Sequence, residues 1–301
     1  MKQKTRYVLP AAERSVVTLS NACKLVKYCS VDCQKDHRPR HKKECKKRAI
    51  EIRDNELFTQ PDGSHYGDCP ICFLPMPLES HRSVKLPCCL KEVCIGCTYA
   101  NELRELNEGL EHRCTLCRNP TSKSKEEGQK NIMERVKAND PAAIRHLGNQ
   151  HFDKREYGIA YEHWTKAAQL GDIEAHNLLS NLYREGKGVG KDMKKEVYHM
   201  ETAAIGGHAP ARHNLGCYEV QNGNIERAVK HFLISANLGY DRSVGAIREL
   251  HTRGSVSKEV YAKALRAYQD AVDATKSSQR EEGEKAQTRI GLYSSFNHHR
   301  R

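Results

Sequence analysis

Eight of the chain's thirteen cysteines lie between Cys69 and Cys117, grouped as four pairs. A C-x2-C pair lets a tight turn point two sulfur atoms at one metal ion, and four thiolates complete a tetrahedral zinc site. The segment therefore has ligands for two zinc ions. The alternative is a set of disulfides or buried thiols. Three pairs have the C-x2-C spacing and one is adjacent: Cys69/Cys72, Cys88/Cys89, Cys94/Cys97 and Cys114/Cys117.

The order of the pairs decides which cysteines share an ion. In a cross-braced module the first and third pairs hold one ion, and the second and fourth pairs hold the other. Such interleaving ties the segment into one unit that folds only with metal. We therefore expect Cys69, Cys72, Cys94 and Cys97 at the first site, and Cys88, Cys89, Cys114 and Cys117 at the second.

This segment resembles a RING finger in three details. Pro70-Ile71 lies inside the first pair, the last pair is C-x2-C, and Arg118 follows the final ligand directly. The resemblance implies ubiquitin-ligase function without a nucleophile of the protein's own. It further implies that Ile71 and neighbouring Leu116 contact a ubiquitin-conjugating enzyme, while Arg118 holds ubiquitin in a reactive pose.

Two details depart from the RING pattern. Counting back from Cys94 puts Cys89 at the third ligand, and the next ligand, usually histidine, falls on Lys91. A protonated lysine cannot bind zinc, so we assign Cys88 in its place, although adjacent ligands are sterically awkward. The loop 98–113 also lacks the tryptophan of many ligase RINGs. These departures favour a second hypothesis, a non-catalytic interaction scaffold with structural zinc.

A second group of possible ligands lies in residues 1–48. The runs Tyr28–Gln34 and Arg38–Cys45 resemble the C-terminal half of a MYND zinc finger, with Ser20 where the family has a cysteine. The resemblance leaves one site with two ligands and the other with three. One zinc held by four of them, an incomplete copy and a decayed module all stay open. The candidate ligands are Cys23, Cys29, Cys33, His41 and Cys45.

The charge of the chain is concentrated at the same end. The formal net charge is +12, and residues 1–48 hold fourteen Lys/Arg against four Asp/Glu. A third hypothesis is therefore nucleic-acid binding through the basic finger. No aromatic residues interleave with the charges, so stacking on bases is unsupported and nucleic acid is the least favoured partner.

Internal repetition dominates the second half of the chain. Helices are expected to open at Ala143, Ala175 and Ala211, each followed by Leu at the fifth position. Partner helices are expected to contain the second motif and to end at Gly171, Gly207 and Gly239, since glycine suits the left-handed conformation that terminates a helix. The second motifs are Trp164–Ala168, Met200–Ala204 and Phe232–Ala236.

Helix pairs of this length, with the turn Tyr183–Asp192, resemble Sel-one-like repeats, relatives of the tetratricopeptide family. A divergent fourth unit starts near Ser243. Such arrays form a curved surface that binds other proteins. No run approaches the ~20 apolar residues of a membrane-spanning helix, and the N-terminus lacks an apolar signal core. Thirteen cysteines without a secretion signal favour a reducing compartment, so we expect a cytoplasmic or nuclear protein.

The sequence thus predicts a mostly α protein, in which small cross-braced zinc modules precede an α-helical solenoid of Sel-one-like repeats. We find no catalytic constellation. The favoured function is a zinc-binding adaptor, with two zinc ions in the RING-like module and ligands for one more in the N-terminal finger. The expected segments are a partial MYND-type finger (1–48), a linker (49–66), the RING-like domain (67–118), a linker with a short helical turn at 132–136 (119–140), the repeats (141–275) and a disordered tail (276–301) that begins as a frayed helix. A helical run is also expected over residues 44–58, across the end of the finger and the start of the linker.

Overall fold

The structure is a computed structural model that describes residues 6–8, 18–19, 26–28, 31–120 and 124–298. Among these, the side chains described are those of 39, 42–120, 124 and 126–289. The chain divides into two compact units, Met1–Thr59 and Gln60–Arg301, and each is described by itself.

The first unit combines a small sheet with one long helix. Strands β1 (Arg6–Val8), β3 (Val26–Tyr28) and β2 (Thr18–Leu19) lie in that order, with β1 parallel and β2 antiparallel to β3. Helix α1 (Val31–Leu57) follows and contains Pro39, which removes one backbone hydrogen bond from the helix. The expected linker 49–66 is therefore helical over its first half, up to Leu57.

The second unit begins with the cysteine-rich module. A short 3-10 helix (Ser80–Arg82) leads into the hairpin β4 (Ser83–Lys85) and β5 (Glu92–Cys94), with Val84 opposite Val93. Helix α2 (Ile95–Glu108) follows directly and ends at Gly109, whose φ of 63° is left-handed. We call residues 67–118 the zinc module. It is compact around its cysteines and three other buried apolar residues, Met76, Leu86 and Val93.

Helix α3 (Lys125–Lys137) joins the zinc module to the repeats. The sequence predicted only a short helical turn at 132–136, whereas the helix is 13 residues long. Ser124 caps it by accepting a hydrogen bond from the Glu127 N–H, and Glu126 and Glu127 in its first turn suit the positive end of the helix dipole. The expected linker 119–140 is therefore largely ordered.

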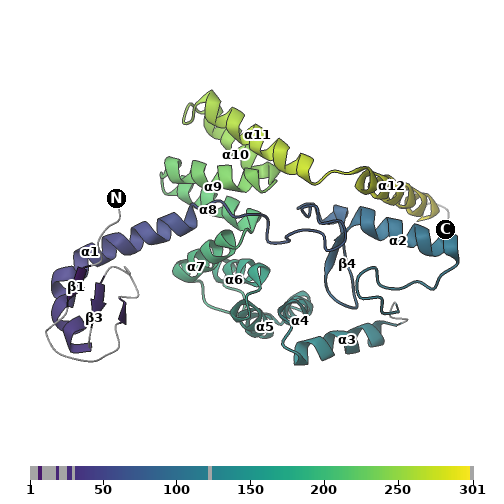
Figure 1. Ribbon diagram of the computed structural model, residues 1–301, viewed down its shortest axis with the longest axis horizontal. Helices are drawn as coiled ribbons and strands as arrows, with labels where there is room; N and C mark the ends of the chain where they lie inside the picture. Colours follow the sequence, from purple (N-terminus) through teal and green to yellow (C-terminus); the bar gives the residue numbers. More distant parts are fainter. Residues whose placement is uncertain (1–5, 9–17, 20–25, 29–30, 121–123, 299–301) are drawn as a thin grey trace. The chain divides into compact units, whose positions relative to one another are not determined.

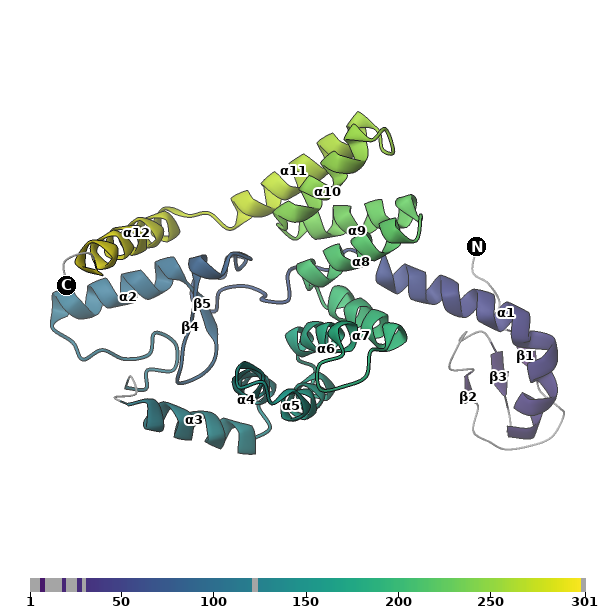
Figure 2. The ribbon, with the colours of Figure 1, turned by 180° about the vertical axis from the view of Figure 1, so that it is seen from behind.

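The predicted mostly α fold with a helical solenoid is confirmed. Eight helices, which we call the repeat array, form antiparallel pairs that stack in chain order (Figures 1 and 2). None of the described helices is both long and apolar enough to cross a membrane. The array comprises α4 (Pro141–Asp153), α5 (Tyr157–Gln169), α6 (Ile173–Glu185), α7 (Met193–Ile205), α8 (Ala209–Gln221), α9 (Ile225–Asn237), α10 (Asp241–Thr252) and α11 (Lys258–Ala274).

In two of the pairs, α4/α5 and α8/α9, a glycine on the first helix faces an aromatic residue on the second. A Cβ on Gly148 would lie 2.5 Å from the Trp164 ring, and one on Gly216 would lie 2.5 Å from the Phe232 ring. Both aromatic side chains are buried. A glycine on the first helix therefore makes room for the aromatic ring of the second, which lets the two helices approach closely.

The repeat frame predicted from the sequence is present in all four pairs. The opening positions Ala143, Ala175, Ala211 and Ser243 are each fully buried. The predicted helix ends are also correct, because each of the three glycines has a left-handed backbone that a residue with a side chain rarely adopts. Their φ values are 89° at Gly171, 84° at Gly207 and 87° at Gly239.

The tail, expected as a frayed helix followed by disorder, forms one continuous helix over residues 278–298, α12 (Ser278–His298). Figures 1 and 2 both show α12 lying along α2 of the zinc module. The charged composition of this segment suggested a solvated chain, but Arg280 and Gly283 are buried against the module. Tertiary contact therefore orders a segment whose own composition would not.

Candidate zinc centres

Three short turns in the zinc module share one backbone geometry. In each, the N–H of the fifth residue donates a hydrogen bond to the carbonyl of the first, and the fifth residue has a positive φ. This curls the peptide so that side chains at the first and fourth positions face the same point. The turns are Cys69–Phe73 (2.9 Å, φ 56°), Leu86–Leu90 (2.7 Å, φ 53°) and Cys114–Arg118 (3.0 Å, φ 60°).

The middle turn explains the adjacent cysteines. Its first position, which is cysteine in the other two turns, is occupied by Leu86, and this side chain is buried in the core of the module. Leucine has no atom that can bind a metal. The sulfur of Cys88, at the third position, therefore takes the missing place beside that of Cys89.

The first cluster consists of the first and third pairs, as interleaving predicts. The sulfur atoms of Cys69, Cys72, Cys94 and Cys97 all lie within 4.8 Å of one another, and those of Cys72 and Cys94 are 3.8 Å apart. Zn–S bonds of about 2.3 Å place sulfurs in a tetrahedral site about 3.8 Å apart. Cys94 and Cys97 also lie at the N-terminus of α2, where the helix dipole favours a thiolate.

The second cluster consists of Cys88, Cys89, Cys114 and Cys117, whose sulfurs also lie within 4.8 Å of one another. The Cys89 and Cys114 sulfurs are 3.9 Å apart, and those of Cys88 and Cys117 are 3.4 Å apart. Cys117 is exposed and Cys88 is half-buried, so this cluster is more open to solvent than the first.

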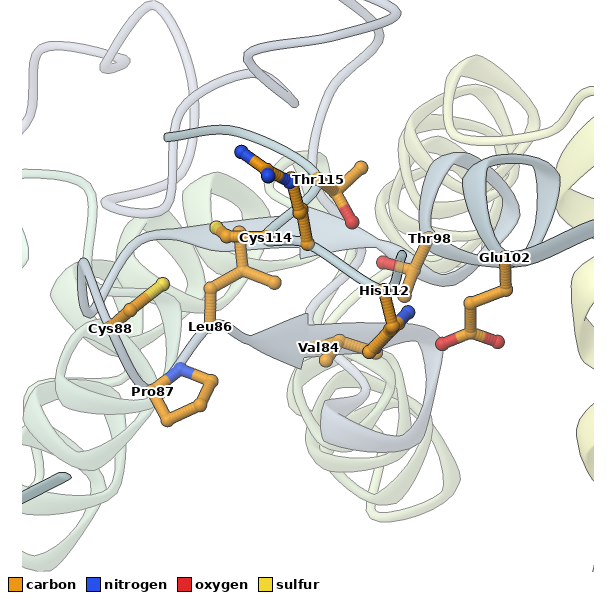
Figure 3. Close-up of a pocket in the computed structure, with 10 residues that line it drawn as sticks. Val84, Leu86, Pro87, Cys88, Thr98, Glu102, His112, Cys114 and Thr115 are labelled. Carbon is orange, nitrogen blue, oxygen red and sulfur yellow. The ribbon is translucent and has the colours of Figure 1, made fainter. Parts of the chain in front are cut away.

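A small pocket of about 130 Å³ lies beside the second cluster (Figure 3). Val84, Leu86 and Pro87 provide apolar lining, and Glu102 extends from α2 at the opposite side. Cys88 and Cys114 belong to both the pocket and the cluster. The pocket therefore gives solvent a route to these two sulfurs.

Each cluster stabilises one thiolate even before a metal arrives. Hydrogen bonding from Cys94 lowers the pKa of Cys69 to about 4. Burial alone would raise the pKa of Cys114, but backbone N–H groups of Cys117 and Leu116 outweigh it and bring the pKa to about 7. Burial raises the pKa of Cys88, Cys89 and Cys97, so zinc must displace protons from these thiols when it binds. The donor set and the separations fit zinc, as the sequence predicted.

Of the three residues proposed to contact partners, Ile71 and Leu116 lie at the third position of the first and third turns, and Arg118 ends the third turn. Ile71 is 37% exposed, and Phe73, two residues further on, is 76% exposed. Leu116 is partly buried against the core of the zinc module. Arg118 is exposed, and its Nη1 donates a 2.9 Å hydrogen bond to Asn101 Oδ1 on α2.

The candidate ligands of the N-terminal finger are described only in part. Cys23 and Cys29 lie outside the described residues. The backbone positions of Cys33, His41 and Cys45 belong to helix α1, and of these only the half-buried side chain of Cys45 is described. The ligand set of this finger therefore stays a prediction.

The sequence did not predict a third cluster, formed by His65, Glu174 and His208. Glu174 Oε2 lies 3.3 Å from His65 Nε2 and 3.0 Å from His208 Nε2. Hydrogen bonds from both imidazoles hold the pKa of Glu174 well below its usual range, although its burial opposes this shift. No local spacing could have indicated the cluster, because its residues are more than thirty positions apart.

Hydrogen bonding at His208 shows that this third cluster is not a metal site. His208 Nδ1 accepts a 3.0 Å hydrogen bond from the Ala211 N–H and so caps helix α8. With Nδ1 accepting, the proton of the neutral ring is on Nε2, which donates to Glu174 and has no lone pair for a metal. The backbone N–H of His65 donates to the Gly207 carbonyl at 3.1 Å. The cluster therefore attaches the segment before the zinc module to the repeat array.

Comparison with known proteins identifies one family within the chain. Residues 16–45 match the model of the MYND finger, which confirms the resemblance predicted for the N-terminal finger. This match contains all five candidate ligands there, Cys23, Cys29, Cys33, His41 and Cys45. No protein in a search of curated proteins matches the chain.

Two solved structures are similar to the chain. One is a Sel1 repeat protein from Oxalobacter formigenes, at 22% identity and a TM-score of 0.44, covering 60% of this chain and 72% of that one. The other is c5321, a protective antigen of uropathogenic Escherichia coli strains with an SLR fold, at 21% identity and a TM-score of 0.39. That match covers 64% of this chain and 40% of the antigen.

Proposed function

We propose that this protein is a zinc-stabilised adaptor whose zinc module recruits a ubiquitin-conjugating enzyme and whose repeat array holds a second protein. The observation that supports this most is the interleaving of two four-cysteine clusters, with apolar Ile71 and Phe73 exposed on the first turn. Exposed apolar side chains on a rigid turn are typical of protein contacts. Zinc has a structural role, because four thiolates leave no open position for substrate.

In the proposed reaction, ubiquitin passes from the thioester of the conjugating enzyme to a lysine amine of the substrate. The amine forms an amide bond, and the enzyme's cysteine leaves as a thiol. The adaptor supplies position only, as expected of a chain without a catalytic constellation. Arg118 suits the role of holding ubiquitin, because a guanidinium has five N–H donors and Asn101 accepts from only one of its nitrogens.

The repeat array is the proposed site for the second protein. Its helix α7 carries Met193, 64% exposed, and Tyr198, 59% exposed, which are the two most exposed large apolar side chains among the described residues of the array. Met and Tyr are enriched in protein interfaces relative to the rest of a protein surface. We infer that this part of α7 contributes to partner binding.

The test is autoubiquitination by the zinc-loaded full chain with a panel of conjugating enzymes. We expect Arg118→Ala and Ile71→Ala to abolish most transfer, and the exposed repeat variant Arg253→Ala to leave it unchanged. Zinc content is measured for each variant, so that loss of metal is not mistaken for loss of contact. If ubiquitin transfer is unchanged in Arg118→Ala, Arg118 does not hold ubiquitin as proposed.

A second candidate is a scaffold that binds proteins without ubiquitin transfer. One specific contact favours it, because the Asn101 side chain that accepts from Arg118 also donates to Glu105 at 2.8 Å. This network engages Arg118 within the zinc module. In this case the chain would bind a partner through the repeats, and no conjugating enzyme in the panel would support transfer.

A further inference from the structure

Helix α12 approaches the zinc module more closely than side chains normally allow. A Cβ on Gly96, in the first turn of α2, would lie 2.6 Å from the Arg280 Cα. A Cβ on Gly283 would lie 3.0 Å from the Gly96 Cα. Two glycines therefore let the backbones of α2 and α12 touch, next to the first cysteine cluster.

Arg280 occupies the centre of this contact. Its side chain is only 2% exposed, although it carries a positive charge. Nη1 donates to the carbonyls of Pro75 (2.7 Å) and Thr275 (2.8 Å), while Nη2 donates to the Leu74 carbonyl (3.0 Å) and to Cys72 Sγ (3.3 Å). No carboxylate is among its hydrogen-bond partners in the part of the chain that the structure describes.

A second residue of α12 extends the same contact. Gln279 Nε2 donates to the Gly96 carbonyl at 3.3 Å and lies 3.9 Å from Cys97 Sγ. One turn further along, Glu284 accepts a 2.6 Å hydrogen bond from Arg82 Nε in the module. Between α12 and the zinc module, an ion pair therefore lies at the edge of the contact, and side-chain N–H groups point at cysteine sulfur atoms at its centre.

Charge accounts for the burial of Arg280. Four thiolates and one Zn²⁺ carry a net charge of −2, and a buried cation is costly unless an anion faces it. Cys72 belongs to the first cluster, so the zinc–thiolate centre is the anion that faces this guanidinium. The second cluster has no hydrogen bond from a cationic side chain among the described contacts.

We propose that Arg280 is the counter-charge of the first zinc centre, and that zinc binding there is coupled to docking of the C-terminal helix α12. Arg280 is a positioning residue, because it acts through Cys72 and the turn around it. The helix is thus a part of the zinc module supplied from the far end of the chain. Because the coupling is reciprocal, removing zinc releases α12, and removing Arg280 weakens the hold on zinc.

The experiment uses the zinc-loaded full chain and three variants. Arg280→Met keeps side-chain length without charge, and Arg280→Lys keeps charge without the planar fork. Arg289→Met removes an exposed arginine from the same helix as a matched control. Zinc transfer to a chelator is followed over time, with alkylation to report which cysteines become free and hydrogen exchange to report α12.

We expect Arg280→Met to speed zinc loss from the first cluster on the order of tenfold, the scale of losing a second-shell partner. Loss from the second cluster stays unchanged, Arg280→Lys lies between Arg280→Met and the unmodified chain, and Arg289→Met behaves as the unmodified chain. Unchanged zinc loss from the first cluster in Arg280→Met would overturn the proposal.

Two further measurements keep the test decisive if Arg280→Met fails to fold. In the unmodified chain, chelation should raise hydrogen exchange throughout residues 278–289, and continued protection there would overturn the coupling. Gly283→Leu keeps Arg280 but separates the helices, so it should speed zinc loss from the first cluster alone. Equal zinc loss with and without this substitution would also contradict the proposal. None of these readouts depends on ubiquitin transfer.

Discussion

The zinc module and the repeat array reach a stable fold by different routes. Five of the eight residues in the buried cluster at the centre of the module are cysteines, and the other three are Met76, Leu86 and Val93. The array instead buries full-sized side chains such as Trp164 and Phe232 against alanine and glycine. A small segment with few apolar residues depends on metal, whereas stacked helix pairs supply a continuous core.

The two regions also differ in the range of their contacts. Each helix of the array packs mainly on helices next to it in the chain, so its structure follows from local repetition. The zinc module contacts residues far away in the chain, since Cys72 accepts a hydrogen bond from Arg280 and Arg82 donates one to Glu284. We therefore expect the stability of the zinc module to depend on metal and on contacts between distant residues. We expect the stability of the repeat array to depend on the volume of its buried side chains.

Metal removal should give the largest effect. Structural zinc sites contribute on the order of 10 kcal/mol each to folding. We expect chelation to abolish protection from hydrogen exchange in α2 and α12, while α4–α11 keep theirs. Collapse of the whole second unit at the same chelator concentration would contradict the separation of the two regions.

Trp164→Ala should have the next largest effect, a loss in the free energy of unfolding of the array. Removing a buried Trp leaves a cavity that costs about 3–5 kcal/mol, and its hydrogen bond to Asn149 Oδ1 (2.9 Å) is lost as well. Denaturant unfolding of the array measures this change. The exposed Tyr198→Ala should change the free energy of unfolding by less than about 0.5 kcal/mol, and zinc content should be equal in both variants.

A glycine pair within the array tests packing with one methyl group. Gly216→Ala places a Cβ against the Phe232 ring and should destabilise the array by about 1–3 kcal/mol. Gly245→Ala, in helix α10, meets no atom within 4 Å and should stabilise by about 0.5–1 kcal/mol through helix propensity. Equal shifts in Tm for the two variants would refute the packing role.

The last prediction concerns the pH dependence of stability. Burial, the neighbouring His176 and Lys195 lower the pKa of His199 to about 4, from its ordinary value of 6.5. The unfolded chain then binds a proton first, so this contribution to stability is present above pH 6.5 and is lost as pH falls toward 4. It amounts to about 1–2 kcal/mol after allowing for partial exposure.

His199→Phe removes this titration and keeps the ring stacked on Tyr183. The variant should lose less stability than the unmodified chain between pH 6.5 and 5, measured by denaturant unfolding of the array. Both proteins contain the same zinc module, so any loss of zinc in acid affects both equally and cancels when their free energies of unfolding are subtracted. If the free energies of unfolding of the two proteins fall in parallel as the pH is lowered, His199 is not the source of the pH dependence.

Local patterns in the sequence predicted much of this architecture. The cysteine pairs predicted both clusters, because C-x2-C spacing sets a turn around a metal and the interleaved order assigns the adjacent Cys88 and Cys89 to the second ion. Glycines at 171, 207 and 239 predicted helix ends for an equally local reason, the left-handed backbone. The long helix α1 was predicted only in part, because Pro39 is rare inside a helix.

Contacts between distant residues were beyond such reasoning. Arg280 and Gly283 sit in a charged segment that suggested disorder, and their partners lie about 200 positions away. The middle turn has Leu86 at the position where the other two turns have cysteine. The sequence did not show this, because it follows only from comparing the backbone hydrogen bonds of the three turns. His208 resembled one more repeat histidine, and only its position beside Glu174 revealed the link to His65.

Cysteine-resolved alkylation of the full chain during stepwise zinc withdrawal tests the interleaved module most directly. The cysteines should become reactive in two sets of four, Cys88, Cys89, Cys114 and Cys117 first, then Cys69, Cys72, Cys94 and Cys97. Release of one zinc ion should accompany each set. Reactivity that appears in sequence order, with Cys69 and Cys72 grouped with Cys88 and Cys89, would contradict the interleaved arrangement.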